Sequence, residues 1–109
     1  MLSSEGIANL NLLKGALTKM WNDSIVLEHE TVMAIPVDAF EIQMTINGSF
    51  RVLLEYETGT FALKLWTGDK FEYLDKIIDD KIYYGFDSML PDNIYNNLKV
   101  LEKVMNLYK

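Results

Sequence analysis

Apolar and polar side chains alternate along three successive segments in the middle of the chain. The segments cover residues 40–45, 50–56 and 61–66, and an Asn-Gly pair and a Thr-Gly pair separate them. Alternation with a period of two is typical of strands with one buried face, and glycine-containing pairs between such runs are typical of hairpin turns. The pattern therefore predicts an antiparallel meander with one apolar face.

The apolar rows also predict the register of the first hairpin. A two-residue turn at Asn47-Gly48 would place the apolar rows of the two strands on opposite faces of the sheet. A three-residue loop over 46–48, with Gly48 in the left-handed conformation, keeps both rows on one face. The pairs that follow from this loop are Met44 with Phe50, Ile42 with Val52 and Phe40 with Leu54.

In the second hairpin, the apolar residues have even numbers before the turn and odd numbers after it. They can face the same side only if the loop around Thr58-Gly59 has two or four residues. An even loop places the apolar rows of the second and third segments on one face, so all three strands share it. The predicted pairs are Tyr56 with Phe61, Leu54 with Leu63 and Val52 with Leu65.

Both ends of the chain have the pattern of an amphipathic helix, with apolar residues three and four positions apart. The first helix is expected from Ser4 to Trp21, with Ser3 or Ser4 as its N-cap, and the second begins at Pro91. The apolar stripes are Ile7, Leu10, Leu13, Leu17 and Met20 in the first helix, and Ile94, Leu98, Leu101, Val104, Met105 and Tyr108 in the second.

Three other segments have less regular patterns. Residues 25–35 are rich in aliphatic and β-branched side chains but alternate imperfectly, which indicates a strand with both faces partly covered. Residues 69–80 begin like a capping box and fit either a short helix or a strand. The aromatic run over 82–86 predicts a last short strand, and Tyr83 and Tyr84 would then point to opposite faces.

These elements define an α+β fold in a single domain covering residues 1–109. It has an N-terminal helix, an antiparallel four- to five-stranded meander sheet and a C-terminal helix. Since the sheet has one apolar face and each helix one apolar stripe, we expect both helices to pack on one face, as a two-layer sandwich. Half of the 109 residues are hydrophobic, which is enough for a sizeable core.

Charge and composition narrow the classes of partner. The net charge is −6, and Arg51 is the only arginine, so a basic face for nucleic acid is absent. The chain has no cysteine, which excludes disulfides, thiolate nucleophiles and cysteine-ligated metals. No apolar run has the length of a membrane span, and a secretory signal is not expected, so the expected location is cytoplasmic.

No catalytic motif stands out, and we expect no catalytic residue, cofactor or metal. His29 is the only histidine, which excludes a multi-histidine metal site. Glu28 and Glu30 share one face of a regular strand, and three aspartates occur within 75–80, but solvated surface charge explains both groups. These carboxylates carry the alternative interpretation, a small-ligand or metal-binding domain with weak hydrolytic activity.

The outer face of the meander carries the candidate interaction surface. In the predicted register, one row contains Gln43, Arg51 and Trp66, and the next contains Glu41, Leu53 and Lys64. Arg51 would lie over the indole of Trp66, and tryptophan and arginine are enriched at interface hot spots. The alternative is that another element covers Trp66. The candidate residues are Gln43, Arg51, Leu53, Lys64 and Trp66.

These observations favour a non-enzymatic protein–protein interaction module, with homodimerisation as one form of it. Small acidic proteins of similar general layout include type III secretion chaperones, bacterial immunity proteins and phage-encoded inhibitors, although the similarity is one of architecture alone. The abundance of Asn, Lys, Ile, Asp and Tyr is typical of AT-rich bacterial or phage genomes. A small bacterial or phage-encoded regulator, inhibitor, immunity protein or chaperone is therefore the expected kind of protein, with another protein as its partner and neither nucleic acid nor membrane.

Overall fold

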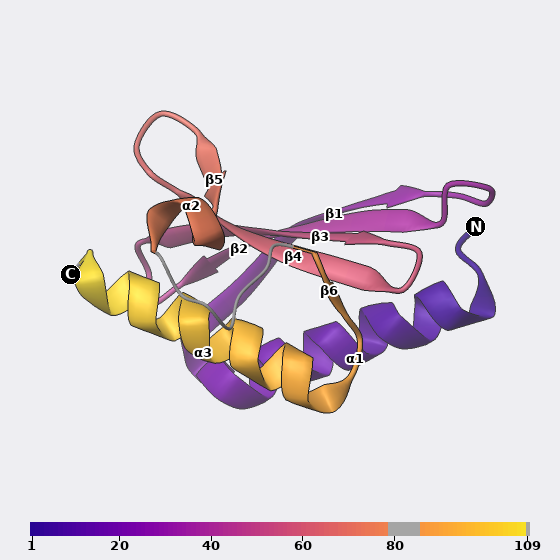
Figure 1. Ribbon diagram of the computed structural model, residues 1–109, viewed down its shortest axis with the longest axis horizontal. Helices are drawn as coiled ribbons and strands as arrows, with labels where there is room; N and C mark the ends of the chain where they lie inside the picture. Colours follow the sequence, from indigo (N-terminus) through magenta and orange to yellow (C-terminus); the bar gives the residue numbers. More distant parts are fainter. Residues whose placement is uncertain (79–85, 109) are drawn as a thin grey trace.

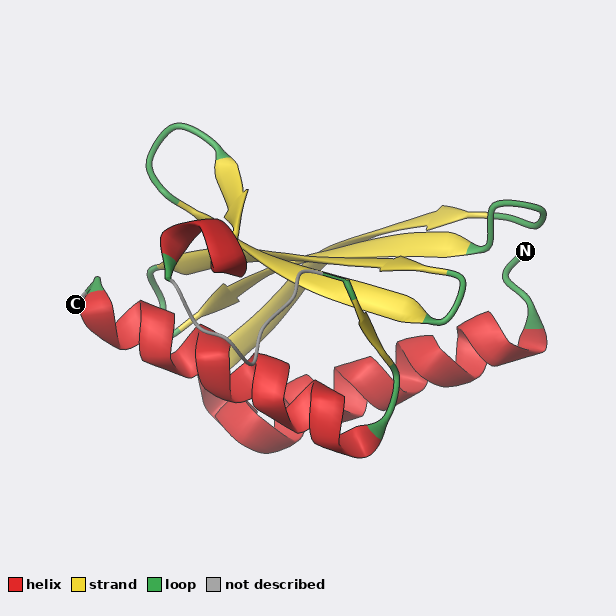
Figure 2. Ribbon diagram, in the orientation of Figure 1, coloured by secondary structure: helices red, strands yellow, loops and turns green. Residues whose placement is uncertain are grey.

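The computed structural model describes residues 1–78 and 86–108 and has two layers, a sheet and a pair of long helices. Both long helices lie on the same side of the sheet (Figures 1 and 2). The strands follow the order β1-β2-β3-β4-β5 with antiparallel neighbours, and β6 pairs with β4. The elements are α1 (Ser4–Trp21), η1 (Asn22–Ser24), β1 (Ile25–Met33), β2 (Ala39–Ile46), β3 (Phe50–Glu57), β4 (Thr60–Trp66), β5 (Phe71–Tyr73), α2 (Leu74–Ile77), β6 (Asp87–Ser88) and α3 (Pro91–Leu107).

The expected α+β architecture is confirmed, and both long helices have the predicted first residues. Ser3 is the N-cap of α1, and its hydroxyl accepts a hydrogen bond from the Gly6 amide at 2.9 Å. Asp38, at the end of the β1–β2 loop, accepts hydrogen bonds from the Ser3 amide and hydroxyl at 2.8 and 2.6 Å. These bonds lower the pKa of the Asp38 carboxyl below its ordinary value. The start of α1 is thereby tied to the sheet.

The core lies between the helices and the inner face of β2, β3 and β4. The inward side chains are almost completely buried: Phe40, Ile42, Met44, Ile46, Val52, Leu54, Tyr56, Phe61, Leu63 and Leu65. The rings of Phe40 and Tyr56 stack with centroids 4.4 Å apart. Within the helix stripes, Ile7 is 41% exposed and Tyr108 lies outside the core, whereas Trp21 is buried instead. One apolar face on three strands is therefore confirmed.

The second hairpin has the predicted register and the first is displaced by two residues. Tyr56 pairs with Phe61 as expected, but Phe50 pairs with Ile46 and not with Met44. The loop is Asn47-Gly48-Ser49, in which Asn47 and Gly48 both have positive φ. A displacement of two keeps every side chain on its face, and this one buries Ile46 completely.

Strand β1 contains a bulge that explains its imperfect alternation. Leu27 pairs with Met44 and His29 pairs with Gln43, so Glu28 is the extra residue. After the bulge the alternation reverses, and Glu30 instead of His29 joins the inner face. The prediction that both faces of this strand are partly covered is wrong. Apart from half-buried Ile25 and Leu27, β1 is exposed along its length, and it is the edge strand of the sheet.

The segment after β4 combines both predicted alternatives. Phe71–Tyr73 forms β5 against β4, and Leu74–Ile77 forms the short helix α2. Residues 79–85 lie outside the described residues. They include most of the strand expected over 82–86, with Tyr83 and Tyr84, and two of the three aspartates, Asp79 and Asp80. Across 1–78 and 86–108, no helix is long and apolar enough to cross a bilayer.

Candidate functional site

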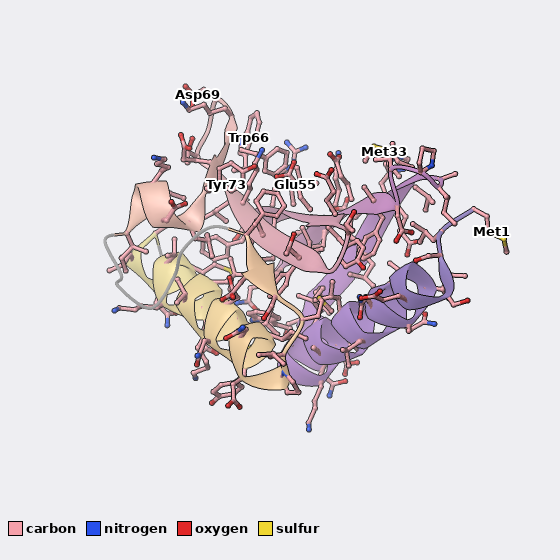
Figure 3. The ribbon with its side chains drawn as sticks, turned by 45° about the vertical axis from the view of Figure 1, so that its right-hand side comes forward. Met1, Met33, Glu55, Trp66, Asp69 and Tyr73 are labelled. Carbon is pink, nitrogen blue, oxygen red and sulfur yellow. The ribbon has the colours of Figure 1, made fainter. Side chains whose placement is uncertain are left out.

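The outer face of the sheet, opposite the two helices, carries aromatic and charged side chains from β3, β4 and β5. Figure 3 shows Glu55, Trp66 and Tyr73 on this side of the sheet. We call this group the outer-face cluster, and its members are Arg51, Glu55, Lys64, Trp66, Phe71 and Tyr73. They meet because the three strands are consecutive and antiparallel, which places alternate residues side by side.

Arg51 and two aromatic rings form one half of the outer-face cluster. The guanidinium carbon of Arg51 lies 5.1 Å from the ring centroid of Trp66 and 5.9 Å from that of Phe71. Trp66 pairs with Phe71 across β4 and β5, and their rings meet edge to face at 5.2 Å. The contact predicted between Arg51 and Trp66 is therefore present. Phe71 adds a second ring to this contact, so that Arg51 lies near both aromatic rings.

Lys64, Glu55 and Tyr73 form the other half. The Lys64 ammonium lies 4.4 Å from the Tyr73 ring centroid and 3.4 Å from Oε1 of Glu55. The Tyr73 hydroxyl donates a hydrogen bond of 2.9 Å to the same oxygen. Burial, followed by the hydrogen bond and charge of Glu55, raises the pKa of Tyr73 to about 12. At neutral pH this phenol is a fixed hydrogen-bond donor.

All five predicted surface residues lie on the outer face, but two predicted rows are wrong. Gln43 lies opposite Leu53, and Arg51 lies opposite Thr45. Glu41 lies opposite Glu55. The displaced register of the first hairpin causes each change, since it moves β2 by two residues along β3. Gln43, Leu53 and Lys64 consequently form one row across three strands.

Two members of the cluster, Phe71 and Tyr73, could not be placed from the sequence, whereas the alternation over 50–56 already placed Glu55 on the outer face. Residues 71–73 fitted a helix as well as a strand, so their rings could not be assigned to a face. The alternating Phe71-Glu72-Tyr73 triplet is the signal that a strand interpretation would have used. Because β5 pairs with β4, Phe71 lies opposite Trp66 and Tyr73 lies opposite Lys64.

Exposure differs across the cluster. Arg51 is exposed, Trp66 is half-buried, and the neighbouring Leu53 is buried, with an exposed fraction of 8%. Trp66 also lines a hollow of about 510 Å³ together with Phe50 and Tyr108, at the end of the sheet. The alternative in which another element covers Trp66 is thus realised only in part, through the edge of Phe71.

The other candidate residues do not form a site. His29 is exposed on β1. Glu28 accepts a hydrogen bond from Thr45, whereas Glu30 forms an ion pair with Lys14 of α1. The prediction that these two glutamates share a face is wrong, because the bulge separates them. In the described ranges, no three histidine, aspartate or glutamate side chains could jointly hold a metal ion.

Neither the comparison with protein-family models nor the searches of curated proteins and solved structures found a match for this chain. The geometry of the outer face is therefore the basis for a functional assignment.

Proposed function

We propose that this chain is a non-enzymatic protein–protein interaction module that binds its partner through the outer-face cluster. The observation that carries the proposal is the exposed Arg51 stacked over the half-buried Trp66, on the sheet face opposite the helices. Tryptophan, tyrosine and arginine dominate interface hot spots because they combine a large apolar area with directed hydrogen bonds. All three residue types lie together here.

The cluster is held in place before a partner binds. Lys64 and Tyr73 both contact Glu55, and Phe71 fixes one edge of Trp66. A surface ordered in advance loses less side-chain entropy on association. Within the described residues Arg51 has no carboxylate partner, so its guanidinium hydrogens are available to an acceptor on the partner.

The proposed setting is that of a small cytoplasmic regulator, inhibitor, immunity protein or chaperone of bacterial or phage type. The acidic net charge and the absence of cysteine support this setting. A second copy of the chain is one form that the partner could take. Such a dimer would use the outer face and not the β1 edge, since a bulge and an inward charge at Glu30 oppose strand pairing along that edge.

The proposal is tested by measuring capture of a partner from the source cell and thermal stability on the same variants. Trp66→Ala and Arg51→Ala should each reduce capture at least tenfold, as hot-spot truncation does. Arg51→Ala should lower the melting temperature by only a few degrees, because its contact with Trp66 contributes about 0.5–1 kcal/mol to the unfolding free energy. Tyr95→Ala is the matched control, because Tyr95 is an exposed aromatic residue on α3. Equal loss of capture in the control, or no loss in Arg51→Ala, would contradict the assignment.

The dimer form is tested by sedimentation equilibrium. If the partner is a second copy, wild-type protein should self-associate and Arg51→Ala should be monomeric at the same concentration. Self-association that persists unchanged in Arg51→Ala and Trp66→Ala would exclude a dimer through this face.

A further inference from the structure

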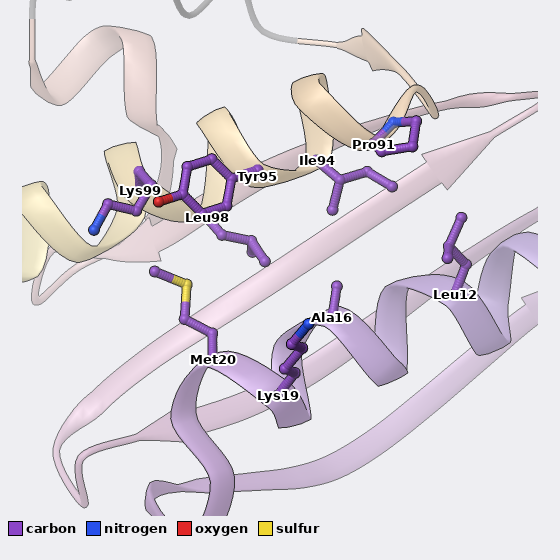
Figure 4. A pocket seen from close by; sticks show the side chains of 9 residues that line it. All are labelled: Leu12, Ala16, Lys19, Met20, Pro91, Ile94, Tyr95, Leu98 and Lys99. Carbon is purple, nitrogen blue, oxygen red and sulfur yellow. The ribbon is translucent and has the colours of Figure 1, made fainter.

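An apolar groove lies between α1 and α3, in the helical layer and away from the outer-face cluster (Figure 4). Its volume is about 410 Å³, within the range of roughly 300–1,000 Å³ that is typical of small-molecule sites. Figure 4 shows side chains of both helices converging on the groove, with Ala16 and Met20 facing Ile94 and Leu98.

Helix α1 carries two apolar stripes. One stripe packs on the sheet, and the other faces α3 and lines the groove. Leu13, Leu17 and Trp21 are buried against the core. Leu12, Ala16 and Met20, spaced by four residues, form a separate stripe that lines the groove. Leu12 remains 47% exposed, which leaves part of this second stripe open to solvent.

Two lysines are among the residues that line the groove. Figure 4 shows Lys19 beside Ala16, whereas Lys99 lies at the end of the groove beyond Leu98. Among the described residues no carboxylate pairs with Lys19, and Lys99 pairs with Glu102 at 2.9 Å on the exposed surface. Lys19 therefore places one ammonium group, unpaired among the described residues, beside the apolar groove of a chain whose net charge is −6.

We propose that this groove binds a small amphiphilic carboxylate of the medium-chain fatty-acid type. The alkyl chain would lie along the apolar residues of both helices, and the carboxylate would pair with the ammonium group of Lys19. A groove of this volume with a mainly apolar lining fits one alkyl chain, and the ammonium group of Lys19 on its lining complements one carboxylate. The inference does not depend on the function proposed for the outer face.

A chain-length series of hexanoate, octanoate and decanoate, each below its micellar concentration, tests the proposal by titration calorimetry. Each added methylene should tighten binding up to about fourfold until the groove is filled. Decanol and decyltrimethylammonium should bind more weakly than decanoate, by up to about fivefold for decanol, because neither can form an ion pair with an ammonium group. Equal affinity for decanoate and decyltrimethylammonium, or no binding of any carboxylate, would overturn the proposal.

Two variants locate the site. Ala16→Phe places a ring in the groove and should abolish decanoate binding while the far-ultraviolet spectrum stays unchanged. Lys19→Glu should weaken decanoate at least fivefold, and Lys70→Glu is the control, since Lys70 makes the same charge change in an exposed loop beyond β4. Equal weakening by Lys19→Glu and Lys70→Glu would assign the effect to net charge and refute the site. Unaltered binding by Ala16→Phe would refute it as well.

Discussion

The two faces of β2, β3 and β4 are built from alternate residues of the same strands, yet they are covered differently. On the inner face, Leu54 lies between Ile42 and Leu63 and is fully buried beneath the helices. On the outer face, its neighbour Leu53 lies between Gln43 and Lys64 and is nearly as buried, at 8% exposed. Rigid packed elements cover Leu54, whereas long polar side chains flank Leu53.

The inner face of the sheet stabilises the fold, whereas the outer face is accessible to a partner. The inner face excludes water through close packing, so any lost atom leaves a cavity. The outer face is held by cation–aromatic contacts and one shared carboxylate, which individually contribute little at a partly exposed surface. A partner can replace the water around the outer-face cluster without disturbing the core. The two faces therefore respond differently to substitution.

The largest expected effect is that of Leu54→Ala. Removing this side chain from a rigid site should destabilise the protein by about 3 kcal/mol, the middle of the range for buried leucines. Leu53→Ala is the matched substitution on the other face and should cost less, about 2 kcal/mol, because the flexible side chains that flank Leu53 can close over the gap. Urea unfolding of both variants measures the difference. Equal costs would show that the outer face is packed as tightly as the core.

A smaller effect is expected between Arg51 and Trp66. A double-mutant cycle with Arg51→Ala and Trp66→Ala should give a coupling free energy of about 0.5–1 kcal/mol. The cycle uses urea unfolding of wild type, the two single variants and the double variant. A coupling free energy near zero would mean that the contact between Arg51 and Trp66 does not stabilise the fold. A value of several kcal/mol would make the stack part of the folding core.

A third expected effect is confined to high pH and concerns Tyr73. Its pKa is raised to about 12 from an ordinary value of 10.0, so the neutral phenol is favoured in the folded state. The resulting stability is fully present below pH 10.0 and is lost as the pH rises toward 12. The unfolding free energy of wild type should fall more steeply over this window than that of Tyr73→Phe. Parallel curves would contradict the proposed bond to Glu55.

The alternating segments predicted three strands and their faces because burial of one apolar row tolerates no slip by a single residue. A slip of two residues leaves every face unchanged, so the pattern alone could not choose between Met44 and Ile46 as the partner of Phe50. In the structure Ile46 is the partner of Phe50, since this register buries Ile46 and Asn47 adopts the positive φ that the loop requires. The bulge at Glu28 escaped prediction for a related reason, since one extra residue resembles imperfect alternation.

Half of the site followed from the sequence, and the remainder depended on long-range pairing. Arg51 and Trp66 belong to strands whose faces were predicted, so their contact could be expected. Phe71 and Tyr73 join them only because β5 pairs with β4, and three residues are too few for a periodic pattern. The groove-lining stripe of α1 was not recognised from the sequence: Leu12 and Ala16 lie outside the predicted stripe, and Met20 was assigned to the stripe that packs on the sheet.

The two tryptophans allow the most direct test of the account. Trp21 lies in the core beneath the sheet, 8% exposed, and Trp66 lies on the outer face. Variants Trp21→Phe and Trp66→Phe each leave one indole for acrylamide quenching of fluorescence. We expect stronger quenching of Trp66 in the free protein, and protection of Trp66 but not of Trp21 when the captured partner is added. Unchanged quenching of Trp66 in the complex would contradict docking on the outer face.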